Sequence, residues 1–269
     1  MKETFFKSLI YDLCNEMNIK VEKLSYNWIL QLSKNGKIRH IIGNYLDLNP
    51  QASACIVNDK CATYEVLKAQ NLPIVEHTLV LNPHVKKNLD FKQDISKIIE
   101  TKFNKYNTLV LKPNNGYKGD GVTLCKSLEE TEIAMKEIFE TNKNVAICPY
   151  YKIKTEYRTF YLNGEILLIY GKNNEKVKDS WKHNLSSGAE PVILQKGKLY
   201  KEIEDLAIKA GQATNIKFAT IDIIQTEDNK LYVLEINSSV CGTIFAEKVD
   251  NGKEMIKDIY RKVLQELFK

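Results

Sequence analysis

The spacing of apolar residues predicts a chain in which amphipathic helices alternate with short strands. Apolar positions that recur every three to four residues predict helices at residues 2–17, 60–70, 91–103, 129–140, 200–213 and 251–268. Short apolar runs predict strands at residues 21–24, 54–57, 78–81, 109–113, 122–125, 145–148, 157–162, 165–170, 218–224 and 232–237. The stretch 173–197 has neither pattern and is predicted to be a long irregular loop, a kind of segment that is usually functional or disordered.

Two turn sequences join neighbouring strands into predicted hairpins. Asn163-Gly164 is a strong hairpin signal, because both residues readily adopt the positive φ angles of a tight turn. The turn 228–230 joins the two predicted strands on either side of it. The C-terminal half of the chain is therefore expected to contain at least two antiparallel strand pairs.

Polar side chains with hard oxygen atoms lie on the last pair of predicted strands. Glu235 and Asn237 share one face of the second strand, because side chains alternate along it. The hairpin can bring Asp222, on the first strand, to the same face. Magnesium suits such a set, since it typically takes one or two carboxylates and completes its shell with water and phosphate oxygens. The alternative is a polar face exposed to solvent.

Residues 112–121 carry three glycines and two lysines between two predicted strands. Glycine lets the backbone approach a phosphate closely, and successive amides can point at the anion. The strand-loop-strand context excludes the Rossmann and Walker loops, which both need a following helix. An ordinary hairpin loop is the alternative. Lys112 at the strand end, together with the carboxylates downstream, favours a site for a triphosphate and magnesium.

Composition and charge narrow the classes of function. The 269 residues are 43% hydrophobic, enough for a sizeable core in one large domain or in two to three small ones. No apolar run approaches the roughly 20 residues that span a bilayer, so we expect no membrane association. The net charge of +5 is mild and only three basic residues are arginines, so we expect no nucleic-acid partner.

The cysteines and the N-terminus indicate the cellular compartment. The six cysteines show no CxxC pair or regular spacing, which fits reduced thiols better than a disulfide framework or a zinc site. The first residues lead into an amphipathic stretch without the apolar core of a signal peptide. We therefore expect a cytoplasmic protein, and the sequence leaves open whether it forms a homo-oligomer.

Several segments, taken in order, resemble the motifs of the ATP-grasp superfamily, in the branch that contains glutathione synthetase, cyanophycin synthetase and the RimK-type glutamate ligases. They are residues 58–63 with 72–75, residues 111–113 with the glycine loop, residues 156–160 with 163–165, residues 183–189, and Asp222 with residues 235–239. The resemblance covers roughly residues 55–250. It implies an α+β fold of two subdomains, 58–148 and 149–269, that clasp ATP after a short N-terminal region, 1–57.

The resemblance also implies a role for each candidate site residue. The predicted ATP-contacting residues are Lys60 and Lys112 on the phosphates, Asn115, Gly116, Tyr117, Lys118, Gly119 and Gly121 in the loop that closes over them, Pro149, Tyr150 and Tyr151 on the adenine, and Glu156 on the ribose. The predicted catalytic residues are Arg158, which would hold the transferred phosphoryl group or the acyl phosphate, and Asn184. Asp222, Glu235 and Asn237 would bind one or two magnesium ions, with manganese as an alternative.

The implied reaction is the ATP-dependent ligation of a carboxylate to an amine through an acyl phosphate, with release of ADP and phosphate. The carboxylate would belong to an amino acid, a peptide or a protein. Two other classes stay open: a kinase-like phosphotransferase with this fold, and a nucleotide-binding scaffold without catalysis. For single residues the alternatives are structural, because Lys60 would then be a surface lysine and Glu156 with Arg158 an ion pair between strands.

Three positions bear on the substrate. His183 stands where relatives often have arginine, and Val240-Cys241 replaces a proline, so Cys241 is expected near the acceptor site. Lys172 and the lysines that follow it are candidates to face an anionic substrate, with a solvated loop as the alternative.

Overall fold

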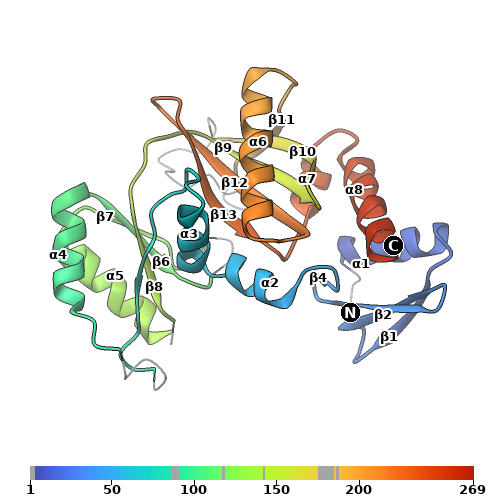
Figure 1. Cartoon of the computed structure of the whole chain (residues 1–269), viewed down its shortest axis with the longest axis horizontal. Helices are drawn as coiled ribbons and strands as arrows, with labels where there is room; N and C mark the ends of the chain where they lie inside the picture. Colours follow the sequence, from blue (N-terminus) through green and yellow to red (C-terminus); the bar gives the residue numbers. More distant parts are fainter. Residues whose placement is uncertain (1–3, 86–90, 117–118, 142, 175–184, 186–187) are drawn as a thin grey trace.

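The structure, a computed structural model, describes residues 4–85, 91–116, 119–141, 143–174, 185 and 188–269. Within these residues the strands form three antiparallel sheets, with helices packed against them (Figure 1). The α+β class predicted from the sequence is therefore confirmed. Among the described helices, none is both long enough and apolar enough to cross a lipid bilayer.

The first sheet belongs to an N-terminal module. Its strands, in the order β1-β2-β3-β4, are β1 (Lys20–Leu24), β2 (Ile29–Lys34), β3 (Lys37–Ile42) and β4 (Tyr45–Leu46). Helix α1 (Phe5–Glu16) shares one apolar core with this sheet and with the C-terminal helix α8 (Gly252–Leu267). Phe6 of α1 meets Tyr260 of α8 edge to face, with ring centroids 5.3 Å apart. The ends of the chain therefore pack on one another.

A loop residue joins this module to the rest of the molecule. The side-chain amide of Asn49 donates to the carbonyl of Phe218 over 2.8 Å. Its oxygen accepts from the backbone N–H groups of Lys217 and Phe218, at 3.0 and 2.8 Å. Three hydrogen bonds thus anchor the N-terminal module to the start of a strand in the third sheet.

Helix α2 (Gln51–Val57) corrects the strand predicted at residues 54–57. A short apolar run does not by itself distinguish a strand from a buried helix. Here the buried positions are Ser53 and Val57, four residues apart, and this spacing places them on one face of a helix. Helix α3 (Lys60–Ala69) follows directly, with the Asp59 side chain accepting from the N–H of Ala62 as its N-cap.

The second sheet carries the glycine loop. Its strands, in the order β5-β8-β6-β7, are β5 (Thr78–Val80), β8 (Val145–Pro149), β6 (Leu109–Pro113) and β7 (Thr123–Cys125). Helices α4 (Ile95–Tyr106) and α5 (Leu128–Glu140) cover one face. Because side chains alternate along β6, Leu109 and Leu111 pack under these helices while Val110 and Lys112 face the other way.

The third sheet is the largest. Its strands, in the order β11-β10-β9-β12-β13, are β11 (Glu190–Ile193), β10 (Glu165–Asn173), β9 (Ile153–Leu162), β12 (Phe218–Thr226) and β13 (Leu231–Asn237). Both predicted hairpins, β9–β10 and β12–β13, are confirmed. Helix α6 (Lys198–Ala213) covers one face, while α7 (Thr243–Lys248) and α8 pack on part of the other.

The second and third sheets meet along one short segment of chain. Backbone N–H groups of Val75 and Val233 donate to the carbonyls of Val233 and Pro73, both at 2.9 Å. Val75 also packs with Val110, Cys148 and Ile224 in a small apolar cluster between the sheets. The nucleotide-binding candidates from both halves of the chain therefore face a common space.

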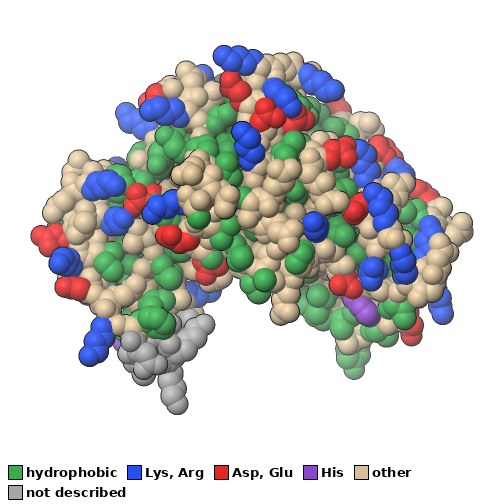
Figure 2. All heavy atoms as spheres, in the orientation of Figure 1, with side chains coloured by type: hydrophobic (Ala, Val, Ile, Leu, Met, Phe, Trp, Pro, Cys, Tyr) green, Lys and Arg blue, Asp and Glu red, His purple; other side chains and the backbone are tan. Residues whose placement is uncertain are grey.

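Charged side chains are spread over the surface. In Figure 2, basic and acidic side chains are interspersed over the visible face rather than gathered by sign. Ion pairs such as Lys201 with Asp205 and Lys262 with Glu165 join many of them. Such exposed pairs contribute little to stability, so the fold depends mainly on its apolar clusters.

We expect Gly211 of α6 to be a sensitive packing position. A methyl group there would lie 2.4 Å from the ring of Tyr161, so Gly211→Ala should lower the free energy of unfolding. The net loss should be at least about 1 kcal/mol, because overpacking outweighs the helix propensity of alanine. Urea unfolding provides the measurement.

The matched control is Gly197→Ala, where an added methyl group meets no atom within 4 Å. Its change should be smaller, since only the capping preference at the start of α6 opposes it. Equal stability of Gly211→Ala and the native protein would mean that α6 does not pack on Tyr161 in this way.

Candidate functional site

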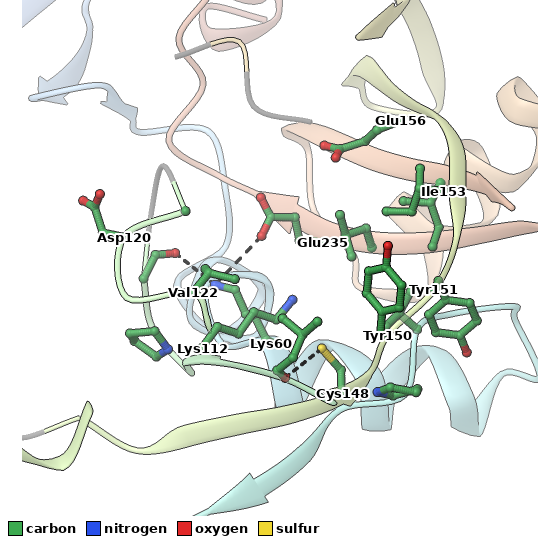
Figure 3. Close-up of a pocket in the computed structure, with 18 residues that line it drawn as sticks. Lys60, Lys112, Asp120, Val122, Cys148, Tyr150, Tyr151, Ile153, Glu156 and Glu235 are labelled. Atoms are coloured by element: carbon green, nitrogen blue, oxygen red, sulfur yellow. Dashed lines mark hydrogen bonds and ion pairs between the residues drawn. The ribbon is translucent and has the colours of Figure 1, made fainter. Parts of the chain in front are cut away.

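A cavity that is open to solvent, with about 930 Å³ of empty space when its open mouth is included, lies between the second and third sheets (Figure 3). One end is apolar and is lined by Val75, Val110, Cys148, Ile224 and Leu234. The other end carries charged side chains from both sheets and from α3. A flat apolar base and a charged phosphate tail would each find a matching end here.

At the apolar end, few backbone N–H groups of residues 149–151 are available to donate a hydrogen bond to a bound base. Pro149 has no N–H group, and the N–H of Tyr150 already donates to the carbonyl of Thr108 over 3.1 Å. Of Pro149, Tyr150 and Tyr151, it is therefore Tyr151 that has a backbone N–H group left for a bound base. Tyr150 and Tyr151 both line the cavity beside the end of β8, so the segment predicted to contact adenine lies at its apolar end.

Lys112 presents a buried positive charge to the cavity. Its residue is only 6% exposed, and its ammonium group ends in the middle of the cavity in Figure 3. None of the described residues gives this ammonium group a hydrogen bond or an ion pair. Burying an unpaired charge is costly, so this position is prepared for an anion.

Lys60, the first residue of α3, approaches the same space from another element. Its ammonium group donates to the carbonyl of Gly116 over 2.9 Å and lies 3.9 Å from the carboxylate of Glu235. Burial lowers the pKa of Lys60, and the attraction of Glu235 offsets this only in part. The two lysines, far apart in sequence, thus lie on one cavity, as predicted.

The glycine loop needs its glycines for space as well as for conformation. Gly121 has a φ of +68°, and a methyl group there would lie 3.0 Å from the ring of Pro113. The Asn114 side chain accepts from the N–H of Cys61 over 3.1 Å, which ties the loop to α3. The Asn115 side chain donates to the carbonyl of Asn58 over 3.2 Å. Gly116 and Gly119 line the cavity, whereas the predicted contacts Tyr117 and Lys118 lie outside the described residues.

Four charged side chains on three neighbouring strands interact beside the cavity, which one of them, Glu156, lines; three of the four are buried and Arg158 is partly exposed. Lys172 of β10 lies opposite Glu156 of β9 and forms an ion pair with it. Arg158 of β9 lies opposite Asp222 of β12. Its guanidinium group donates to both carboxylate oxygens, from Nε to Oδ1 over 2.7 Å and from Nη2 to Oδ2 over 2.6 Å. The Lys172 ammonium group also reaches Oδ2 of Asp222 over 3.3 Å. Two cations and two anions therefore compensate one another.

Burial and these ion pairs shift the pKa values of Asp222, Lys172 and Glu156. Burial alone would raise the pKa of Asp222, but Arg158 and Lys172 outweigh it and lower the value to about 2. Burial and Arg158 would lower the pKa of Lys172, but the carboxylates of Asp222 and Glu156 leave it above its usual value. Burial raises the pKa of Glu156 despite the attraction of Lys172. Asp222 is therefore firmly ionised at neutral pH.

The predicted metal ligands lie at adjacent positions of β12 and β13. Asp222 faces Glu235 across the pair, and Asn237 donates to the Glu235 carboxylate over 3.0 Å. A bulge beside Asp222 lets the consecutive residues Leu234 and Glu235 both line the cavity, which regular alternation forbids. The donor set of two carboxylates and one amide fits magnesium, provided that phosphate oxygens or waters complete the shell. Among the described residues, no group of three or more His, Cys, Asp or Glu side chains is arranged as a metal site by itself.

The structure decides between the alternatives for Lys172 and refines the predicted ion pair of Glu156 and Arg158. Lys172 is the last but one residue of β10 and is only 2% exposed, so it belongs to the site and not to a solvated loop. Glu156 and Arg158 do form ion pairs between strands, but each with a partner on a neighbouring strand. The predicted catalytic residue Asn184 lies outside the described residues, as does His183.

The sequence matches a known family and named relatives. The model of the RimK-like ATP-grasp domain matches residues 57–259. A tetrahydromethanopterin:alpha-L-glutamate ligase of Methanocaldococcus jannaschii is 32% identical over 145 residues, which are 50% of this chain and 46% of that protein. A D-alanine–D-alanine ligase of Clostridium beijerinckii is 25% identical over 214 residues, 77% of this chain and 67% of that protein. The chain thus spans about half the length of the first relative.

Solved structures agree on the fold. The D-alanine–D-alanine ligase of Bacillus anthracis, complexed with ATP, superimposes with a TM-score of 0.60 and 18% identity, over 82% of this chain and 67% of that one. At this identity the likeness concerns the fold alone, and it confirms the predicted ATP-grasp fold. Because the family model matches most of the chain, the protein belongs to the RimK-like ATP-grasp family.

Proposed function

We propose that the protein is a ligase that uses magnesium–ATP to join a carboxylate to an amine through an acyl phosphate, releasing ADP and phosphate. The buried ammonium group of Lys112, unpaired among the described residues and directed into the cavity, carries this proposal. A family fold that binds no anion in the cavity would not need to keep a costly charge at this position.

The cavity gives each part of ATP a place. The base would lie at the apolar end between Val75, Cys148 and Tyr150, and the triphosphate would run toward Lys112 and Lys60. Gly116 and Gly119, which line the cavity, would with Asn115 present the loop backbone to the phosphates. Glu156, which also lines the cavity, would accept from the ribose hydroxyls.

Asp222, Glu235 and Asn237 would hold the magnesium ion, which supplies charge neutralisation at the β- and γ-phosphates when bound. Glu235 is the most accessible carboxylate of the set, with a side chain 26% exposed. Its only cation within 4 Å among the described residues is Lys60, at 3.9 Å, so it is available to a metal.

Arg158 would meet the group that is transferred. Its Nε and Nη2 atoms hold Asp222, while its side chain remains 23% exposed. A guanidinium group fixed in this way is preorganised to stabilise charge on a phosphoryl group or on an acyl phosphate. An oxygen of the substrate carboxylate attacks the γ-phosphorus and ADP leaves. The amine then attacks the acyl carbon, and phosphate departs with that oxygen.

The acceptor is proposed from the relatives' names. Both named relatives ligate an amino acid, so we propose an amino acid or a peptide as the substrate. A kinase-like phosphotransferase and a non-catalytic scaffold are the other candidates, and the isotope experiment below separates them.

Replacing Lys112 should separate nucleotide binding from stability. Lys112→Met removes a buried, unpaired charge, so the free protein should be at least as stable as the native one. ATP affinity should fall by about 10- to 100-fold, the value of one lost charged hydrogen bond. Calorimetry measures the affinity, and Lys136→Met on the exposed side of α5 is the control, with no expected change.

Replacing Glu235 should remove metal dependence. Glu235→Gln keeps the shape of the side chain but weakens a magnesium ligand, so the gain in ATP affinity on adding magnesium should shrink strongly. Stability should change by at most about 1 kcal/mol, because the nearest ion pair is long and partly exposed. Glu227→Gln, exposed at the far end of the same hairpin, is the control. An unchanged response to magnesium would refute the metal assignment.

Oxygen labelling tests the reaction. The enzyme is incubated with ATP, magnesium and a set of amino acids and short peptides whose carboxylates carry ¹⁸O. Ligation through an acyl phosphate moves one labelled oxygen into the released phosphate, which mass spectrometry detects beside an amide product. AMP and pyrophosphate would instead indicate adenylation, a stable phosphorylated product would indicate a kinase, and ATP binding without turnover would indicate a scaffold.

A further inference from the structure

Lys172 is among the most deeply buried charges at the site, and the proposed reaction leaves it without a role. It is 2% exposed and contacts two carboxylates at once, Glu156 through an ion pair and Asp222 at 3.3 Å. Glu156 and Asp222 are themselves 5% and 1% exposed. A lysine buried this deeply between two proposed ligand-binding carboxylates affects whatever those carboxylates bind.

The carboxylate of Asp222 is fully engaged in the nucleotide-free protein. Oδ1 accepts from Nε of Arg158 at 2.7 Å, and Oδ2 accepts from Nη2 of Arg158 at 2.6 Å and from Lys172 at 3.3 Å. A metal ion that binds Asp222 must therefore compete with a cation that is already there. Positive charges close to a carboxylate repel an arriving divalent cation.

The two resident cations differ in how firmly they hold Asp222. Arg158 makes two short, parallel hydrogen bonds, the strongest arrangement for such a pair. Lys172 makes one longer contact and has a second carboxylate, Glu156, to keep it compensated if it leaves. Lys172 is therefore the cation that can withdraw at the lower cost.

We propose that the Lys172 ammonium group is the resident counter-ion of Asp222 in the nucleotide-free protein, and that it releases Oδ2 when magnesium–ATP binds. This rests on the proposed magnesium site. Lys172 keeps its pair with Glu156 and gains freedom to turn toward the incoming phosphates. Binding of the ammonium group and of the metal to Asp222 are then negatively coupled, and such coupling acts equally in both directions.

The test uses Mn²⁺ alone, without nucleotide, and counts free Mn²⁺ by electron paramagnetic resonance. Lys172→Met removes the competitor, so Mn²⁺ should bind the nucleotide-free protein more tightly, by about tenfold, within the usual range for coupled sites. Glu156→Gln should act in the opposite direction, because the ammonium group then has Asp222 as its only carboxylate partner. Charge alone would also give effects of opposite sign, but these would cancel in the double variant Glu156→Gln/Lys172→Met, whereas the counter-ion role predicts that the double variant keeps the tighter binding.

Stability is measured in the same variants. Lys172→Met leaves Glu156 buried without its cation and should lower the denaturation midpoint. The double variant Glu156→Gln/Lys172→Met removes both charges, so it should regain stability while retaining the tighter Mn²⁺ binding. It also keeps the test valid if the single variant does not fold. Lys102→Met, which breaks an ion pair with Glu76 away from the cavity, is the control and should leave Mn²⁺ affinity unchanged.

The outcomes separate this inference from the proposed function. If the native protein binds magnesium–ATP but neither Lys172 variant binds Mn²⁺ more tightly, the counter-ion role is wrong and the ligase proposal stands. If no variant binds Mn²⁺ and the affinity for ATP does not depend on magnesium, the assignment of the metal site is wrong, and this inference fails with it.

Discussion

The arrangement of the site depends on one constraint, the need to neutralise buried charges on adjacent strands. Arg158 and Asp222 lie directly opposite each other on β9 and β12, and their two short hydrogen bonds fix both side chains. A buried ion pair gains its stability only when the geometry is this good, so the register of β9 and β12 cannot slip. Because β13 pairs with β12, the same register also sets where Glu235 and Asn237 lie.

The part of the fold that contains the site was largely predictable, because strong local signals coincide with most of its elements. An exception is β11, which lies in the stretch 173–197 that was predicted to be irregular. Asn163-Gly164 and the turn after Thr226 placed both hairpins of the third sheet, and apolar periodicity placed α3 to α6 and α8. The N-terminal sheet was missed beyond β1. A signal existed in Asn35-Gly36, whose φ angles of 51° and 75° form the tight turn between β2 and β3. The short and partly polar strands around it hid the alternation.

Within the site, the sequence named Lys60, Lys112, Asp222 and Glu235, and the structure brings them to one cavity or its border. The sequence did not show that Lys172 pairs with Glu156, because the pairing depends on a shift in strand register. Counting back from the hairpin turn places Gly171 opposite Glu156, but a bulge at Leu167 shifts the register by one residue and brings Lys172 there instead. No local pattern announces such a bulge, so the partner of Glu156 emerged only from the three-dimensional pairing.

The three hydrogen bonds of Asn49 have a consequence for motion. They fasten the N-terminal module to the third sheet, and α8 packs against both, so these parts share one continuous apolar core. The second sheet contacts these parts through the segment at Val75, through the crossing after Pro149, and through Asn114, which accepts from the backbone N–H groups of Lys60 and Cys61 in α3. Any relative displacement of the two sheets would have to strain these contacts, and it would change the separation between Lys112 on β6 and the carboxylates on β12 and β13.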